Sequence, residues 1–247
     1  MKTIIKKETK KAAQKLLSAG TTNAKTVKNS IKSFILYLTP GTVNGFNMCP
    51  HASAGCLGSC LHTAGFAGVY KSVNAARLRK TEYFLTDRKA FLLQLSYEIM
   101  KQYVKAKKEN IKIAIRLNGT SDVDFIYLLN KHAGLNIETL ADHIYFYDYS
   151  KVLQRAIRYK DHKNYTVTFS RSETNHKETD QAISLGINVA AVFSSDLPHT
   201  YKGAKVIDGD KSDILMIYNK GIILGLKAKG KARKDTSGFV INTDLPF

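Results

Sequence analysis

The sequence predicts an α/β fold, specifically a partial (β/α) barrel with mainly parallel strands. Three observations predict it: strand-like and helix-like segments alternate, polar residues follow most of the strands, and all three cysteines follow the first strand. At 247 residues with 44% apolar content, the chain can bury one large core. No run of about eighteen apolar residues occurs, so we expect no membrane-spanning segment.

A basic arm precedes the predicted domain. Residues 1–32 carry nine lysines and one acid, and 1–18 show a weak apolar stripe at helical spacing. We therefore expect a helical arm over 1–32 and a single barrel-like α/β domain over 33–247.

The strands are predicted from short apolar runs rich in β-branched or aromatic residues and bounded by turn residues. They fall at 33–38, 111–117, 143–147, 165–169, 187–193, 205–207 and 222–226. Helices are predicted at 73–80, 87–107, 124–131 and 177–185, and a further helix is predicted to end at Tyr159. The helix at 87–107 is the clearest, with Thr86 as a suitable N-cap. Strands alternating with helices indicate parallel βαβ units, whose strand ends share one edge of the sheet.

The cysteines are Cys49, Cys56 and Cys60, with the spacing C-x6-C-x3-C. Three cysteines cannot all pair in disulfides, and the lysine-rich N-terminus has no apolar signal region. We therefore expect a reducing cytoplasm, where cysteine clusters bind metal or do chemistry. Three thiolates suit a [4Fe–4S] cluster with its fourth iron open to a ligand.

Zinc is the main alternative at these cysteines. A structural zinc ion takes four ligands, and His51 or His62 would be the fourth. The six-residue spacing is less natural for zinc modules, whose cysteines come in closer pairs. Inert or catalytic thiols are the third alternative.

Polar residues after the other strands are the remaining candidate site residues, because the strand ends meet at the same edge. The candidate cofactor-binding residues are Asn118, Gly119, Asp122, Ser170 and Arg171. The candidate catalytic residues are Arg116, Asp148, Lys151, Asp208 and Asp210. Arginines at strand ends can clamp a carboxylate or phosphate, although buried ion pairs are about as common. Asp-Gly-Asp is more often only a turn.

The net charge of +18 favours polyanionic partners, so nucleic acid or a nucleotide is a candidate partner. The alternative is that the positive charge only keeps the protein soluble. The acids that could hold Mg²⁺ are Asp122, Asp124, Asp208, Asp210 and Asp213. An alternative function is therefore a nuclease, nickase or other nucleic-acid-binding protein with a structural iron–sulfur or zinc site. A metal-stabilised interaction protein is a third hypothesis.

A three-cysteine cluster at the mouth of a partial barrel resembles the radical S-adenosylmethionine enzymes. The resemblance implies that the open iron takes the amino and carboxylate groups of S-adenosylmethionine. It also implies that 118–122 occupies the place of that family's methionine-binding segment, which it does not match cleanly. The spacing departs from that family's usual C-x3-C-x2-C. An enzyme of this kind, of unknown substrate, is the leading hypothesis.

A second resemblance covers most of the chain. It rests on residues 38–40, 47–50, 54–56, 60–61, 76–77, 80–81, 147–151, 208–210, Asp213 and 225–230. These segments are similar to the bacteriophage "gene product eighty-eight" domain family. That resemblance implies a phage gene expressed in a bacterial cytoplasm, and it implies no particular activity.

Overall fold

The computed structural model describes residues 15–20, 31–60 and 70–243. Its strands are β1 (Leu17–Ala19), β2 (Lys32–Leu36), β3 (Thr42–Val43), β4 (Phe46–Asn47), β5 (Ile113–Arg116), β6 (Ile144–Ser150), β7 (Tyr165–Ser170), β8 (Val189–Phe193), β9 (Thr200–Tyr201), β10 (Ala204–Asp208), β11 (Ile223–Lys227) and β12 (Val240–Ile241). Its α-helices are α2 (Ala54–Gly58), α4 (Lys71–Thr86), α5 (Arg88–Lys108), α6 (Phe125–Ala133), α7 (Leu153–Arg158), α8 (His176–Ser184) and α9 (Leu215–Tyr218). Two 3₁₀ helices are η3 (Ile137–Leu140) and η4 (Gly230–Lys234).

Ten of the strands form one mostly parallel sheet, so the predicted α/β class is confirmed. Its order is β1-β2-β5-β6-β7-β8-β11-β10-β9, with β12 added beside β8. Strands β2, β5, β6, β7, β8, β11 and β10 run parallel, while β1 and β9 are antiparallel edge strands. Each of the seven predicted strands overlaps one of the parallel strands.

The order of the last strands differs from a simple barrel. Strand β11 lies between β8 and β10, so the chain turns back on itself at this end of the sheet. Burial gives the reason: Ile223, Leu224 and Gly225 of β11 are buried, whereas most of β10 is only half-buried. In the described residues the strand order ends at β1 and β9, no pairing joins these two, and the sheet does not close.

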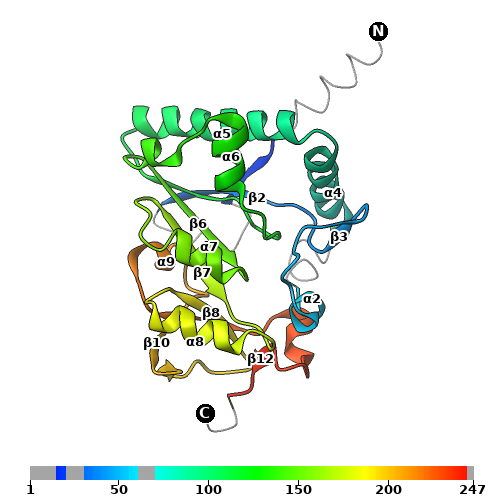
Figure 1. Ribbon diagram of the computed structural model, residues 1–247, viewed down its shortest axis with the longest axis vertical. Helices are drawn as coiled ribbons and strands as arrows, with labels where there is room; N and C mark the ends of the chain where they lie inside the picture. The colour runs from blue at the N-terminus through cyan, green and yellow to red at the C-terminus, as the bar shows by residue number, and fades with distance from the viewer. Residues whose placement is uncertain (1–14, 21–30, 61–69, 244–247) are drawn as a thin grey trace.

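The main core lies on the helix-covered face of the sheet. Strands β2, β5, β6, β7 and β8 are neighbours in chain order, and right-handed crossovers place their helices on one face. Figure 1 shows α6, α7 and α8 in front of the sheet, with α5 across its top. Side chains such as Phe91, Phe125 and Phe146 fill this layer. A smaller cluster on the other face includes Tyr147 of β6 and Met216 of α9.

Two sequence predictions need correction. The helix expected over 1–18 is wrong at its end, because Leu17–Ala19 is β1 and pairs with β2; residues 1–14 lie outside the described residues. Glu98 favours this extended chain by accepting hydrogen bonds from the backbone N–H groups of Leu16 and Leu17 (2.9 Å each). The N-cap of α5 is Asp87, which accepts from the Ala90 N–H (3.0 Å), and Thr86 is instead the last residue of α4.

Within 15–20, 31–60 and 70–243, no helix is both long and apolar enough to cross a membrane.

Candidate functional site

The cysteine segment leaves the carboxyl end of β2, the first parallel strand, as the sequence predicts. It forms the β3–β4 hairpin, whose turn uses the left-handed backbone of Asn44 and Gly45. The Met48 N–H then donates to the Gly41 carbonyl (2.8 Å), and Asn47 Oδ1 accepts from the Cys49 N–H (2.8 Å). These bonds fix the position at which Cys49 enters the site.

Helix α2 carries Cys56 and is held in place by Glu173, which follows β7. The Ser53 hydroxyl donates to one Glu173 carboxylate oxygen (2.7 Å), and the Gly55 N–H donates to the other (2.8 Å). Ser53 also caps α2, accepting from the Cys56 N–H (3.2 Å). The sequence placed Ser170 and Arg171 after the strand at 165–169, but no local pattern predicted this long-range contact of Glu173.

Gly55 is where α2 meets the segment before β12. A Cβ at this position would lie 2.7 Å from Phe239 Cβ and 2.9 Å from Glu173 Cδ. Arg171, buried at the end of β7, holds that segment by donating to the carbonyls of Gly238 (2.6 Å) and Phe239 (2.7 Å). Arg171, predicted to bind a cofactor, therefore holds in place the segment before β12, against which α2 packs.

The three thiols are close enough to influence one another electrostatically. Burial raises the pKa of Cys49 to about 11; Asp122, Cys60 and Cys56 add to this rise, and a backbone hydrogen bond from Gly41 opposes it. Burial also raises the pKa of Cys56, against the lowering effect of the Lys151 ammonium, which hydrogen-bonds to it. Cys56 therefore lies beside Lys151, a predicted catalytic residue, and within electrostatic reach of the other two thiols.

The three thiols are near one another in the structure, but they are not arranged as the ligands of a single metal ion. Among the described residues, no three His, Cys, Asp or Glu side chains are grouped as ligands of one metal ion. His51, one predicted zinc ligand, is exposed, and His62, the other, lies outside the described residues. Three thiols are nevertheless the donor set that iron–sulfur clusters use.

Arg77 is a site residue that the sequence analysis assigned only to a basic helix. Its guanidinium carbon lies over the Tyr37 ring, 5.0 Å from the ring centre. Burial lowers its pKa, while Tyr37 and Cys60 raise it, so the guanidinium lies within electrostatic reach of the third cysteine. The only sequence signal for it is its place in the family-like segment 76–77.

The loop after β5 is a packed support for the cysteine segment. Buried Asn118 accepts from the Val123 N–H (2.8 Å) and donates to the Val123 carbonyl (2.9 Å). Gly119 passes so close to β2 that a Cβ would lie 2.5 Å from the Tyr37 ring. The Cys49 thiol lies 3.7 Å from the Thr120 carbonyl at the tip of this loop. These contacts give Asn118 and Gly119 a scaffolding role beside the thiols.

Asp122 ties this loop to the end of β6 and to α7. Its carboxylate accepts from Arg155 Nη1 (2.5 Å), from the Ser150 hydroxyl (2.8 Å) and from the Lys151 N–H (2.9 Å). Its own N–H donates to the Met48 carbonyl (2.9 Å). The network thus positions both Lys151 and the residue before Cys49.

Asp148 is a buried carboxyl group within β6. Burial raises its pKa to about 6, although Arg116, Asn118 and Arg155 lower it. The Asn118 N–H donates to one of its oxygens (2.7 Å), and the Tyr165 hydroxyl donates to the other (3.3 Å). It therefore joins β6 to the loop after β5 from inside the protein.

Of the remaining predicted catalytic residues, Arg116 and Asp210 have their charges paired. Arg116 lies over the Tyr149 ring at 4.7 Å, and its Nη1 is 3.9 Å from buried Asp213. Asp210 pairs with Lys229 (2.8 Å) and also accepts from the Lys227 N–H (2.9 Å). Asp208, in turn, accepts from the Asp210 N–H (2.9 Å). Ser170 lies at the end of β7, and its carbonyl accepts from Asn175 (3.0 Å).

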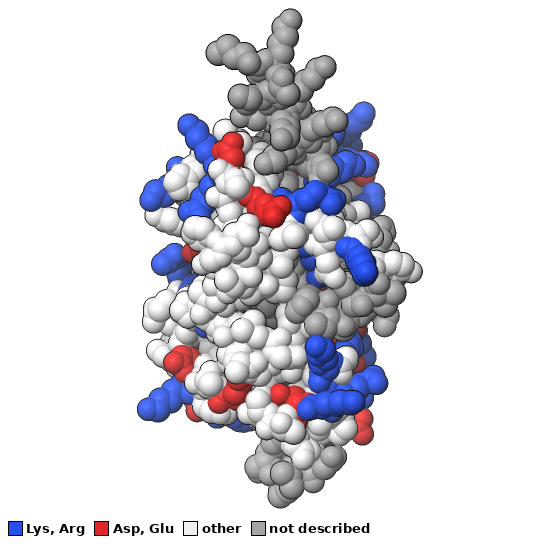
Figure 2. Space-filling model, turned by 90° about the vertical axis from the view of Figure 1, so that its right-hand side faces the viewer, with Lys and Arg blue, Asp and Glu red and all other residues white. Residues whose placement is uncertain are grey.

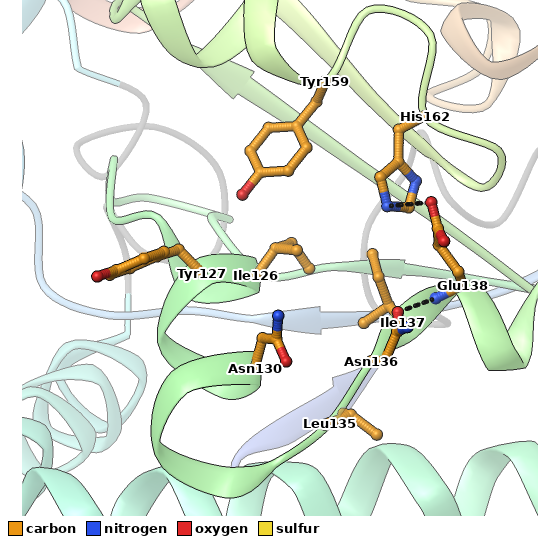
Figure 3. Close-up of a pocket in the computed structure, with 9 residues that line it drawn as sticks. All are labelled: Ile126, Tyr127, Asn130, Leu135, Asn136, Ile137, Glu138, Tyr159 and His162. Carbon is orange, nitrogen blue, oxygen red and sulfur yellow. Dashed lines mark hydrogen bonds and ion pairs between the residues drawn. The ribbon is translucent and has the colours of Figure 1, made fainter.

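A pocket of about 290 Å³ lies elsewhere, between α6, η3 and the end of α7. Figure 3 shows Tyr159 and His162 on one side and Asn130 of α6 on another, with His162 Nε2 3.6 Å from the Glu138 carboxylate. η3 and His162 come before β6 and β7, whereas the thiols follow a strand's carboxyl end. Because open α/β sheets bind ligands at the carboxyl ends of their strands, the thiol edge is the better candidate site.

These features define an α/β protein whose mostly parallel sheet carries a three-thiol segment at its carboxyl edge. The family model for Gene product 88 matches residues 3–243, so the chain belongs to this family of phage gene products. The predicted family membership is confirmed. No curated protein and no solved structure matches the chain. The resemblance to radical S-adenosylmethionine enzymes stays a prediction.

Proposed function

We propose that this phage protein binds a [4Fe–4S] cluster through Cys49, Cys56 and Cys60 with one iron open, and is a radical-S-adenosylmethionine-like enzyme of the host cytoplasm. The observation that carries the proposal is that the segment bearing all three cysteines leaves the carboxyl end of β2, with its thiols within electrostatic reach of one another. Glu173 and the tight packing of Gly55 hold the middle cysteine in place. Such fixed positions suit a resident cofactor.

The spacing of the cysteines favours a cluster over zinc. Zinc modules use cysteine pairs separated by two to four residues, whereas Cys49 and Cys56 are separated by six. Of the two histidines that could complete a zinc site, His51 is exposed and His62 lies outside the described residues.

The strand order also supports the proposal. Strands β2, β5, β6, β7 and β8 follow one another in space as they do in sequence, the order of a partial (β/α) barrel. Strands in this order bring their carboxyl ends to one edge of the sheet. A cluster there would supply the electron for the reaction, while the protein would hold the reactants and exclude water. Lys151 supplies positive charge at Cys56.

The test is the EPR spectrum of the anaerobically prepared, reduced protein. We expect a cluster signal that changes when S-adenosylmethionine is added, because the cofactor binds the open iron. A variant with all three cysteines replaced by serine should give no such signal. A cluster signal that S-adenosylmethionine leaves unchanged would contradict the open-iron proposal and favour a structural cluster.

As a second candidate, we propose nucleic-acid binding at the same edge of the sheet. Five basic residues between 227 and 234 are exposed, and no acid pairs with Lys231 or Lys234 in the described part of the chain. Figure 2 views the side that bears α2 and α4, where basic side chains, with some acidic ones among them, lie above and below a largely uncharged middle. Cationic groups at such an edge attract a phosphate backbone.

The salt dependence of binding tests this second candidate. Affinity for a short DNA or RNA should fall steeply with salt, and replacing both Lys231 and Lys234 with glutamine should lower the slope by about one to two. The matched control replaces exposed Lys108 and Lys163, which come just before β5 and β7, at the opposite edge of the sheet. Equal effects of the two double variants would contradict a binding surface at 227–234.

A further inference from the structure

We infer that Arg77 donates hydrogen bonds to the sulfur atoms of a metal centre at Cys60 and raises the reduction potential of that centre. This inference rests on the proposed cluster and names the residue that regulates it. Arg77 comes from α4, outside the cysteine segment.

The observation behind the inference is a pair of unsatisfied donors. Nε and Nη1 of Arg77 are buried and have no hydrogen-bond partner in the part of the chain that the structure describes. A buried, charged donor without an acceptor costs free energy, so such atoms mark the place of an acceptor. Cys60 is the thiol whose charge acts on this guanidinium.

Tyr37 does not replace that acceptor. Its ring attracts the arginine charge at 5.0 Å, but an N–H pointing at a ring face gains much less than a hydrogen bond. The sulfur atoms of thiolates and of an iron–sulfur cluster accept N–H hydrogen bonds, and cluster potentials depend on them. Because the two nitrogens are closed to solvent, an acceptor built into the protein fits them better than an anion arriving from solution.

The position of Arg77 is fixed from β2. The Thr39 N–H, just beyond β2, donates to the buried Thr81 hydroxyl (2.8 Å), which in turn donates to the Arg77 carbonyl (2.9 Å). These hydrogen bonds fix the position of Arg77 relative to β2, the strand from which the cysteine segment leaves. A fixed donor acts on a centre more strongly than a mobile surface charge.

Lys151 provides a second cation at Cys56, so positive groups from two separate elements reach the thiols. Reduction adds one negative charge to the centre. Nearby N–H donors and cations stabilise that charge and make the reduction potential less negative. Removing the Arg77 guanidinium should therefore make the centre harder to reduce.

The experiment compares R77Q, R77K and the control R79Q after anaerobic reconstitution. Arg79 is exposed on the same helix, so R79Q matches the change in net charge without the buried donors. Iron and sulfide per chain are measured first, and the midpoint potential is then followed by EPR. We expect R77Q to shift to a more negative potential, R77K to shift less, and R79Q to match the wild type.

Each outcome decides a separate point. If the wild type takes up no iron, the proposed function fails. If the wild type holds a cluster and R77Q has the wild-type potential, or R79Q shifts as far as R77Q, only the role of Arg77 fails. If R77Q folds, as judged by circular dichroism, but does not hold iron, while R77K does, the arginine contact with the centre is supported. If R77Q does not fold, the midpoint potential of R77K tests the inference instead. A wild-type potential in R77K would contradict the inference.

Discussion

At the scale of single residues, Gly55 shows how closely the cysteine helix is fitted to its surroundings. Its missing side chain lets α2 approach Phe239 and Glu173. Gly58, in the same helix, has nothing within 4 Å of its would-be Cβ. The two glycines therefore form a matched pair for mutation.

Replacing Gly55 with alanine should lower the free energy of unfolding by about 1–3 kcal/mol, because the added methyl group has no room. Gly58→Ala should be neutral or slightly stabilising, since alanine favours helix. Urea unfolding of both variants measures the effect, and iron content after reconstitution should fall only in G55A. Equal stability of the two variants would show that α2 is not packed as described.

Asp148 predicts a specific dependence of stability on pH. Its pKa is about 6 in the folded protein and ordinarily 3.8, so the folded state favours the protonated form. The resulting stabilisation is fully present below pH 3.8 and is lost as the pH rises through 6. Relative to Asp148→Asn, the wild type should gain on the order of 1 kcal/mol between pH 7.5 and pH 5.

Urea unfolding of both proteins across that range tests this prediction, since the difference removes the contribution of other titrating groups. A stability difference that stays constant with pH would mean that Asp148 titrates normally.

At the scale of elements, the link between the loop after β5 and α7 depends on one buried ion pair. The Arg155 and Asp122 side chains are only 8% and 10% exposed. On the same helix, Arg158 is 59% exposed and pairs with Asp124 at 3.1 Å. The loss of the buried pair should therefore lower the free energy of unfolding far more than the loss of the exposed pair.

Arg155→Gln should lower the free energy of unfolding by about 3 kcal/mol, because it leaves the Asp122 carboxylate buried without its charge partner. Arg158→Gln should cost less than about 1 kcal/mol. Both values come from urea unfolding. If the two variants lost the same stability, Asp122 would not be the link between these elements.

The sequence predicted the parallel strands well because each is a short apolar run that must be buried. It did not predict the place of β11, since that depends on how deeply β10 and β11 are buried relative to each other. It also missed β1, where Glu98 holds the backbone extended from 80 residues away. Local sequence patterns do not predict such long-range contacts.

At the scale of the whole molecule, the site joins segments that lie far apart in the chain. Helix α2, which carries Cys56, is held by Glu173 and packs against Phe239, while Arg77 of α4 lies within electrostatic reach of Cys60. The sequence predicted that the thiols and strand ends share one edge, because parallel strands place their carboxyl ends together. It did not distinguish residues that support the site, such as Asn118, from those that face it.

The basic surface is a second property of the whole molecule. Much of the +18 charge lies on exposed lysines, and some are paired with acids, as Lys227 is with Asp196 (3.1 Å). The unpaired ones near η4 lie at the carboxyl edge, because η4 follows β11. A phosphate-bearing substrate would therefore be drawn to the same edge as the thiols.

The central claim is that Cys49, Cys56 and Cys60 hold an iron–sulfur cluster. The most direct test is the metal and acid-labile sulfide content of protein purified without oxygen. The account predicts about four iron and four sulfide per chain, lost when the three cysteines are replaced with serine. A colourless protein that contains one zinc per chain and no iron would contradict it.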